Sequence, residues 1–137
     1  MRVGIDTNIL VYYLDTDSPF HKECRKNLTR LVKSQQAVLT QQNLVELAVV
    51  LTRAGISSEQ GGIYVKGFSD SMPVVRPTLT TLKVFLNLLE DTSKNGVVLF
   101  DLYLAATFTS NDINNIYTYN DKDFNDIKTL KLWKGRL

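Results

Sequence analysis

The chain has 137 residues, of which 44% are hydrophobic and 22% are charged, and its formal net charge at pH 7 is +2. These values predict one globular domain over residues 1–137, and so small a charge does not by itself identify a nucleic-acid-binding protein. The single cysteine, Cys24, excludes an intramolecular disulfide. Because no signal-peptide pattern and no run of about 18 apolar residues occurs, we expect a cytoplasmic protein that does not bind membranes.

Apolar periodicity and turn residues predict strands that alternate with helices along the chain. The expected strands span residues 2–5, 37–40, 74–75, 115–119 and 130–133. The expected helices span residues 7–14, 18–33, 41–54, a stretch that begins after Ser57, 78–92 and 97–110. This alternation predicts a three-layer α/β/α sandwich with a mostly parallel central sheet.

The expected helix ends carry familiar capping residues. Thr7 or Asn8 is expected to cap the first helix, and Pro19 to lie in the first turn of the second. Gly55 is expected to end the helix over residues 41–54, and Ser57 to cap the next helix. These positions fix where the chain turns between the elements.

Two of the expected helices carry unusually many apolar side chains. In residues 41–54 they lie nearly all round the helix, which predicts a buried helix in which Glu46 fills the one polar gap. In residues 78–92 they form one stripe that is expected to be core. The stripe consists of Leu79, Leu82, Phe85, Leu86 and Leu89.

The helix over residues 18–33 has one basic side, opposite an apolar one. The basic residues are Lys22, Arg25, Lys26, Arg30 and Lys33. Such a stripe is either a solvated helix face or a surface that binds phosphates. His21 and Cys24 lie three residues apart on this helix, but no further His or Cys is present to complete a zinc site.

Three acidic residues stand isolated in apolar sequence. Asp6 follows the first strand, Glu46 is the only acid in residues 44–51, and Asp101 is the only charged residue in residues 97–106. Burying an unpaired charge costs more free energy than the net stability of a domain. The three acids therefore predict a shared cation. Without the cation they should repel one another and raise the pKa of at least one. The alternative for Glu46 is a structural pair with Arg or Lys.

The acids are expected to meet beyond the carboxyl ends of the strands, where parallel sheets bind ligands. Asp6 follows the first strand, Asn120 and Asp121 follow the strand that ends at Tyr119, and helices can bring the other two acids over the same edge. Carboxylates without His or Cys form a hard oxygen site, which suits Mg²⁺ or Mn²⁺. Such an ion favours phosphodiester hydrolysis. The alternative for Asn120 and Asp121 is turn and cap chemistry alone.

In this order and spacing the residues resemble the PIN-domain ribonucleases, and most closely the VapC-type toxins of toxin–antitoxin pairs. The matching segments are Asp6-Thr7-Asn8, Glu46, Asp101 before Leu-Tyr-Leu-Ala-Ala, and Thr118-Tyr119-Asn120-Asp121-Lys122-Asp123-Phe124. The resemblance implies a PIN-like fold, an RNA substrate, a small antitoxin partner and a homodimer.

The resemblance also assigns roles to single residues. It implies that Asp6, Glu46 and Asp101 are the core acids and that the hydroxyl of Thr118 orders the site. The family places Asp or Asn two residues after this Thr, a position that Asn120 occupies here, with Asp121 next to it.

The activity that the resemblance implies is Mg²⁺-dependent endoribonuclease cleavage, in which Asp6 and Asp101 hold the ion and Glu46 positions or deprotonates the attacking water. One rival is a receiver-like signalling domain, which needs paired acids after the first strand, an Asp at the end of the third and a Lys at the end of the fifth. The other is a PIN-like module that binds RNA or protein without catalysis.

Overall fold

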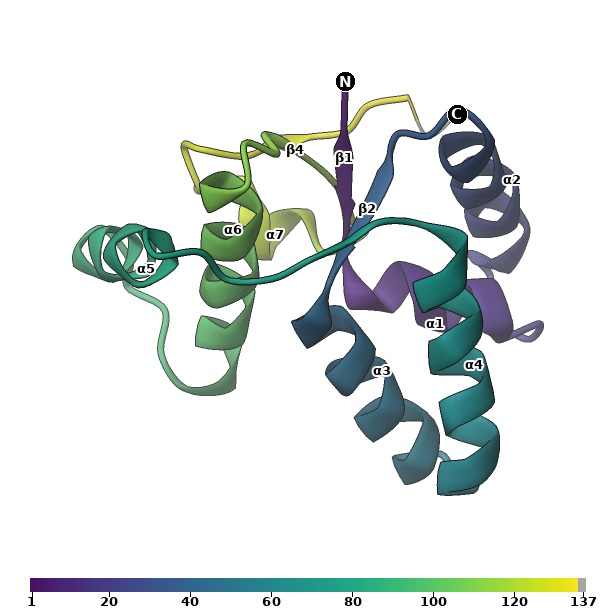
Figure 1. Ribbon diagram of the computed structural model, residues 1–137. Helices are drawn as coiled ribbons and strands as arrows, with labels where there is room; N and C mark the ends of the chain where they lie inside the picture. The colour runs from purple at the N-terminus through teal and green to yellow at the C-terminus, as the bar shows by residue number, and fades with distance from the viewer. Residues whose placement is uncertain (136–137) are drawn as a thin grey trace.

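The computed structural model describes residues 1–135, so the last two residues of the predicted domain lie outside the described part (Figure 1). Five strands form one all-parallel sheet in the order β3-β2-β1-β4-β5. The strands are β1 Val3–Ile5, β2 Ala37–Thr40, β3 Val74–Val75, β4 Asn115–Tyr117 and β5 Lys131–Leu132. The helices are α1 Thr7–Leu14, α2 His21–Lys33, α3 Gln41–Arg53, α4 Ser58–Ser71, α5 Thr81–Glu90, η1 Gly96–Val98 (3₁₀), α6 Leu99–Ser110 and α7 Asp121–Phe124.

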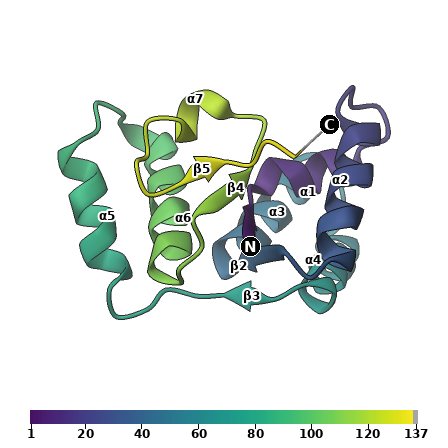
Figure 2. The same ribbon diagram turned by 90° about the horizontal axis from the view of Figure 1, so that it is seen from above.

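Helices cover both faces of the sheet, which confirms the predicted three-layer α/β/α architecture. Alternation along β1 sends Val3 and Ile5 into the core formed with α1 to α4. On the other face α6 and α7 cover the sheet, and α5 packs on the outside of α6 (Figure 2). On that second face, a Cβ at Gly4 would lie 2.8 Å from the ring of Phe108, so the absence of a side chain lets α6 approach the strand. No helix in residues 1–135 is long and apolar enough to cross a membrane.

Two helices begin three residues later than the sequence predicts. Before α2, the backbone N–H of His21 donates to the carbonyl of Ser18 at 3.1 Å, and Ser18 Oγ accepts from the N–H of Phe20 at 3.1 Å. Before α5, Thr81 Oγ1 accepts from the N–H of Thr78 at 2.8 Å. In both places a hydroxyl closes a turn that competes with the first turn of the helix, so Pro19 lies outside α2.

The predicted cap of α1 is also wrong. Asp6 occupies the N-cap position, with extended backbone angles, and its side chain makes no capping hydrogen bond. The carboxylate is instead engaged by Thr118, 112 residues along the chain. The caps predicted at Gly55 and Ser57 are confirmed, because Gly55 has a φ of +95° and Ser57 Oγ accepts from the N–H of Gln60 at 3.1 Å.

The predicted burial of two helices is wrong in part. On α5, Leu79 precedes the helix and is fully exposed, while Leu82 and Leu86 are 61% and 51% exposed. On α3, Val45 and Val49 are 65% and 44% exposed. Each helix is covered on one side only, since α5 lies outside α6, and α3 packs on α1 and α4 (Figure 1). Periodicity marks an apolar face, but it does not say whether this domain or another molecule covers it.

Candidate active site

The site begins where β1 and β4 end side by side. Asp6 follows β1, is 4% exposed, and donates its backbone N–H to the carbonyl of Tyr117 at 3.0 Å. Thr118 Oγ1 donates to Asp6 Oδ2 at 2.8 Å and accepts from the N–H of Asn120 at 2.9 Å. One buried hydroxyl therefore links the carboxylate to the loop after β4. The strand ends at Tyr117, two residues earlier than the sequence predicts, so Thr118 lies in this loop and not in the strand.

Glu46 reaches the same edge from α3. Thr40 and Asn43 form a capping box that fixes the start of α3 at the end of β2. Asn43 Nδ2 then donates to Thr7 Oγ1 at 3.0 Å, and Thr7 Oγ1 donates to Glu46 Oε1 at 2.8 Å. Thr7 is the residue after Asp6, so this chain of hydrogen bonds sets Glu46 beside the first acid.

Two carboxyl groups of the site have strongly raised pKa values. Burial raises the pKa of Asp6 from 3.8 to about 6; the hydrogen bond from Thr118 opposes burial, and the charges of Glu46 and Asp123 add to it. Asp101 lies in the first turn of α6, and its pKa is raised from 3.8 to about 7. Burial is the largest cause, and the charges of Asp6, Asp123 and Glu46 raise the pKa further. Burial is the larger cause of both raised pKa values, and the repulsion expected from the sequence adds to it.

Asp123 is a member of this group that the sequence reasoning missed. It lies in α7, the short helix that follows Asn120, and its N–H donates to the carbonyl of Asn120 at 3.0 Å. A residue three positions after a helix start returns to the same side of the helix, so a helix at this point is the signal that would have found it. Asn120 is half-buried beside Thr118, and Asp121 opens α7. Their roles stay predictions.

A structural ion pair does not account for the isolated acids. In the part of the chain that the structure describes, the salt bridges join Lys66 to Asp70 and Lys94 to Asp126, and Glu46 belongs to neither. Glu46 instead accepts hydrogen bonds from the hydroxyl of Thr7 and, at 3.4 Å, from the side-chain amide of Gln42. This weighs against the alternative that Glu46 is half of a structural pair.

The donor set fits a hard divalent cation, but it does not form a closed cage. Across residues 1–135, no three His, Cys, Asp or Glu side chains lie close enough together to hold a metal by themselves. Mg²⁺ keeps several of its waters and often takes only one or two protein carboxylates. Carboxylates that repel one another at one sheet edge therefore fit Mg²⁺ or Mn²⁺, and some of them would hold the ion through water.

The sequence profile of the PIN domain matches residues 3–130. The chain belongs to the PIN-domain family. The sheet order supports this assignment against the receiver-like alternative, because a receiver places β1 between β2 and β3, whereas here β1 lies between β2 and β4. No curated protein sequence matches the chain.

Several solved structures share the fold of this PIN domain. A structure of VapBC2 from Rickettsia felis bound to a promoter DNA fragment superimposes with a TM-score of 0.76 at 20% identity, over 97% of this chain and 98% of that one. DNA-bound VapBC from Salmonella typhimurium gives a TM-score of 0.73 at 17% identity, over 97% of each chain. VapC20 from Mycobacterium tuberculosis, a toxin that cleaves the sarcin-ricin loop, gives a TM-score of 0.68 at 14% identity, over 88% of this chain and 92% of that one.

Proposed function

We propose that this PIN domain is an endoribonuclease that depends on Mg²⁺ or Mn²⁺ and acts in the cytoplasm as the toxin of a toxin–antitoxin pair. The observation that carries the proposal is the group of repelling carboxylates at the carboxyl edge of the sheet, from Asp6, Glu46, Asp101 and Asp123. The toxin assignment is supported by the similar structures, which include a toxin and toxin–antitoxin complexes.

The proposed roles follow from where each side chain is held. Asp6 and Asp101 hold the cation, with Glu46 as a further ligand, directly or through water. When bound, the cation would stabilise charge on the phosphate and acidify the attacking water. Thr118 fixes one oxygen of Asp6 by its hydrogen bond at 2.8 Å, which orients the carboxylate. Asn120, Asp121 or Asp123 supplies the fourth polar group.

Glu46 is proposed to take the proton of the attacking water. Thr7 donates to its Oε1 at 2.8 Å and Gln42 Nε2 lies 3.4 Å from its Oε2, so both oxygens are oriented. The water oxygen forms the new bond to phosphorus as the bond to the ribose 3′ oxygen breaks. The ribose 3′ oxygen takes up a proton from solvent as it leaves, so the products carry a 5′-phosphate and a 3′-hydroxyl.

End-labelled RNA tests the proposed function. The purified protein should cleave the RNA in Mg²⁺ or Mn²⁺ and stop when EDTA is added, and the new ends should carry 5′-phosphates. Cleavage that continues in EDTA would refute the metal requirement. Binding of the RNA without any cleavage in either metal would favour the alternative of a PIN-like module that only binds.

The basic side of α2 is a proposed path for the RNA backbone. Arg25 stacks over the ring of Tyr13, with its guanidinium carbon 5.1 Å from the ring centre, and Arg30 does the same over Trp133 at 5.3 Å. Lys26 is exposed between them, so the three cations form one outward face. If this face binds phosphates, RNA affinity should depend steeply on salt.

We expect the combined change of Arg25, Lys26 and Arg30 to Gln to weaken RNA binding and to flatten its salt dependence. The slope of log K against log [salt] should fall by about 0.7 for each phosphate of single-stranded RNA that the variant no longer neutralises. Filter binding at several salt concentrations measures the slope. The control is Lys66→Gln, which removes a basic residue from α4. An unchanged slope in the triple variant would mean that this side of α2 is only solvated.

A second copy of the chain and a small antitoxin are the proposed protein partners. Two exposed apolar surfaces support this proposal, one on α3 with Val45 and Val49, and one on α5 with Leu82 and Leu86. Exposed apolar surface of this kind commonly marks a protein interface.

Sedimentation of the purified protein should give the mass of a dimer. Two double variants locate the interface, Leu82→Ser with Leu86→Ser on α5 and Val45→Ser with Val49→Ser on α3. The variant that becomes a monomer has lost apolar contact area from the dimer interface. A wild type that is monomeric at every concentration would contradict the homodimer.

A further inference from the structure

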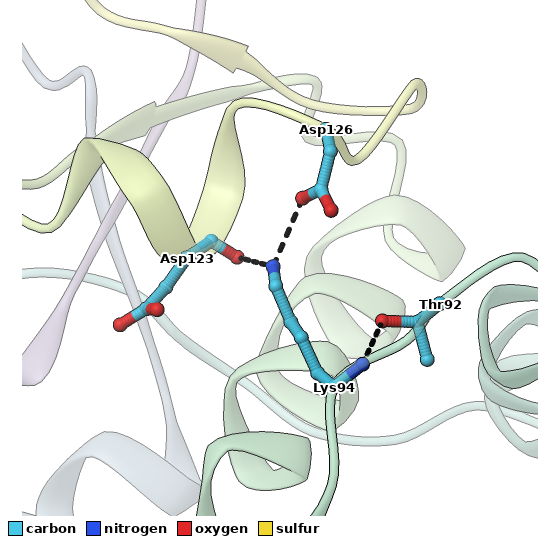
Figure 3. Close-up of polar contacts among 4 residues, drawn as sticks. All are labelled: Thr92, Lys94, Asp123 and Asp126. Carbon is cyan, nitrogen blue, oxygen red and sulfur yellow. Dashed lines mark hydrogen bonds and ion pairs between the residues drawn. The ribbon is translucent and has the colours of Figure 1, made fainter.

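Lys94 bridges two segments that carry acids of the candidate site. It lies in the loop between α5 and η1, just before the helix that bears Asp101, and its Nζ donates to the backbone carbonyl of Asp123 at 2.6 Å (Figure 3). Nζ also donates to Asp126 Oδ1 at 2.9 Å, and the N–H of Lys94 donates to Thr92 Oγ1 at 3.1 Å. The side chain of Lys94 is only 16% exposed, so water competes weakly for its donors.

The bond to the Asp123 carbonyl matters because α7 has only four residues. The last carbonyl groups of a helix have no hydrogen-bond partners within the helix. A cation at that end can donate to one of them and interacts favourably with the helix dipole. A helix this short does not persist without such anchors. Phe124, which is fully buried, anchors α7 in the core, and Lys94 supplies a second anchor at the C-terminal end of the helix.

The same contact determines which way Asp123 faces. Its carbonyl points to Lys94, whereas its carboxylate points away from Lys94 (Figure 3). The charge of that carboxylate acts on both Asp6 and Asp101, so it lies on the side of the other acids. The positive charge of Lys94 also acts on Asp101 and lowers its pKa, whereas the negative charge of Asp123 raises it.

We propose that Lys94 is a positioning residue, which clamps α7 so that the carboxylate of Asp123 faces the other acids. The catalytic part of this inference rests on the proposed nuclease function, but the clamp itself does not. Lys66 provides a matched comparison, because its Nζ lies 2.6 Å from Asp70 Oδ2 while the two side chains are 77% and 64% exposed. It makes an ion pair of the same type as that of Lys94 with Asp126, but on the surface.

The first test uses hydrogen exchange and needs no activity. The N–H of Asn125 donates to the carbonyl of Asp121 at 2.8 Å and that of Ile127 to the carbonyl of Phe124 at 3.1 Å. In metal-free protein, Lys94→Met should speed exchange of these amides, Lys94→Arg should restore their protection, and Lys66→Met should leave it unchanged. Equal protection in Lys94→Met and wild type would overturn the clamp.

The second test is a double-mutant cycle on RNA cleavage at saturating Mg²⁺. Lys94→Met should lower the rate about tenfold, which is typical of a residue that orients a ligand. If Lys94 acts through Asp123, the same change should have almost no further effect in an Asp123→Asn background. Equal losses in both backgrounds would overturn the role in positioning. Lys94→Gln serves in both tests if Lys94→Met does not fold.

The two tests separate failure of this inference from failure of the proposed function. A wild type that cleaves no RNA would refute the nuclease function, and hydrogen exchange would still decide whether Lys94 holds α7. A wild type that cleaves RNA, with Lys94→Met equal to it in rate and in exchange, would refute the inference alone.

Discussion

Asp6→Asn and Asp101→Asn should each lower the rate of Mg²⁺-dependent RNA cleavage by about tenfold or more, because each replaces a proposed metal ligand by a neutral side chain. Asn keeps the size of Asp, and its side-chain oxygen can still accept the hydrogen bond that Thr118 donates. The loss would therefore report charge and metal binding more than packing. Initial rates on labelled RNA at saturating Mg²⁺ measure it.

The matched control is Asp70→Asn, which removes an exposed acid of α4 from its pair with Lys66. It changes the net charge of the protein by the same amount and should leave the rate near that of wild type. Full activity in Asp6→Asn or Asp101→Asn would show that cleavage takes place elsewhere on the protein.

The metal-free protein should become less stable as pH rises from about 4 to about 7. Asp6 and Asp101 have an unfolded pKa of 3.8 and folded pKa values of about 6 and about 7. Between these values the folded state binds more protons than the unfolded state, so the free energy of unfolding falls with pH through this window. Above about pH 7 the destabilisation is fully present.

Mg²⁺ should reverse this loss, and at about 100 times its dissociation constant it should add about 2.7 kcal/mol to the free energy of unfolding. In EDTA at neutral pH, Asp101→Asn should melt at a higher temperature than wild type, because it removes one repelling charge. In Mg²⁺ the variant should gain less than wild type does.

Thermal melts of both proteins, each in EDTA and in Mg²⁺ at several pH values, measure these differences, with Asp70→Asn as the charge control. If Asp101→Asn were less stable than wild type in EDTA, or if wild type did not respond to Mg²⁺, the carboxylates would not share a site.

The sequence predicted the positions of β1, β2 and α1 well because each is a short apolar run with polar residues at its ends. The same isolation in apolar sequence picked out Asp6, Glu46 and Asp101. These acids are recognisable because a charged side chain inside a buried element needs an explanation of its own.

The parts that the sequence did not predict depend on contacts between distant segments. The helix α7 is too short to show periodicity, so no helix was predicted there and Asp123 was not expected in the site. The hydrogen bond between Asp6 and Thr118 was not expected either, because Thr118 follows a different strand, 112 residues along the chain. The exposure of Leu82 and Val45 depends on which helices happen to cover them, and spacing along one helix carries no information about that.

Binding of Mn²⁺, followed by electron paramagnetic resonance of the free ion, tests most directly whether these carboxylates share one cation. Titrated into EDTA-stripped wild type at neutral pH, Mn²⁺ should be taken up saturably and be displaced by Mg²⁺. Asp101→Asn should weaken this uptake by about tenfold or more, whereas Asp70→Asn should not change it. If wild type took up no Mn²⁺, or if Asp101→Asn bound it as tightly as wild type, the proposed metal site would be wrong.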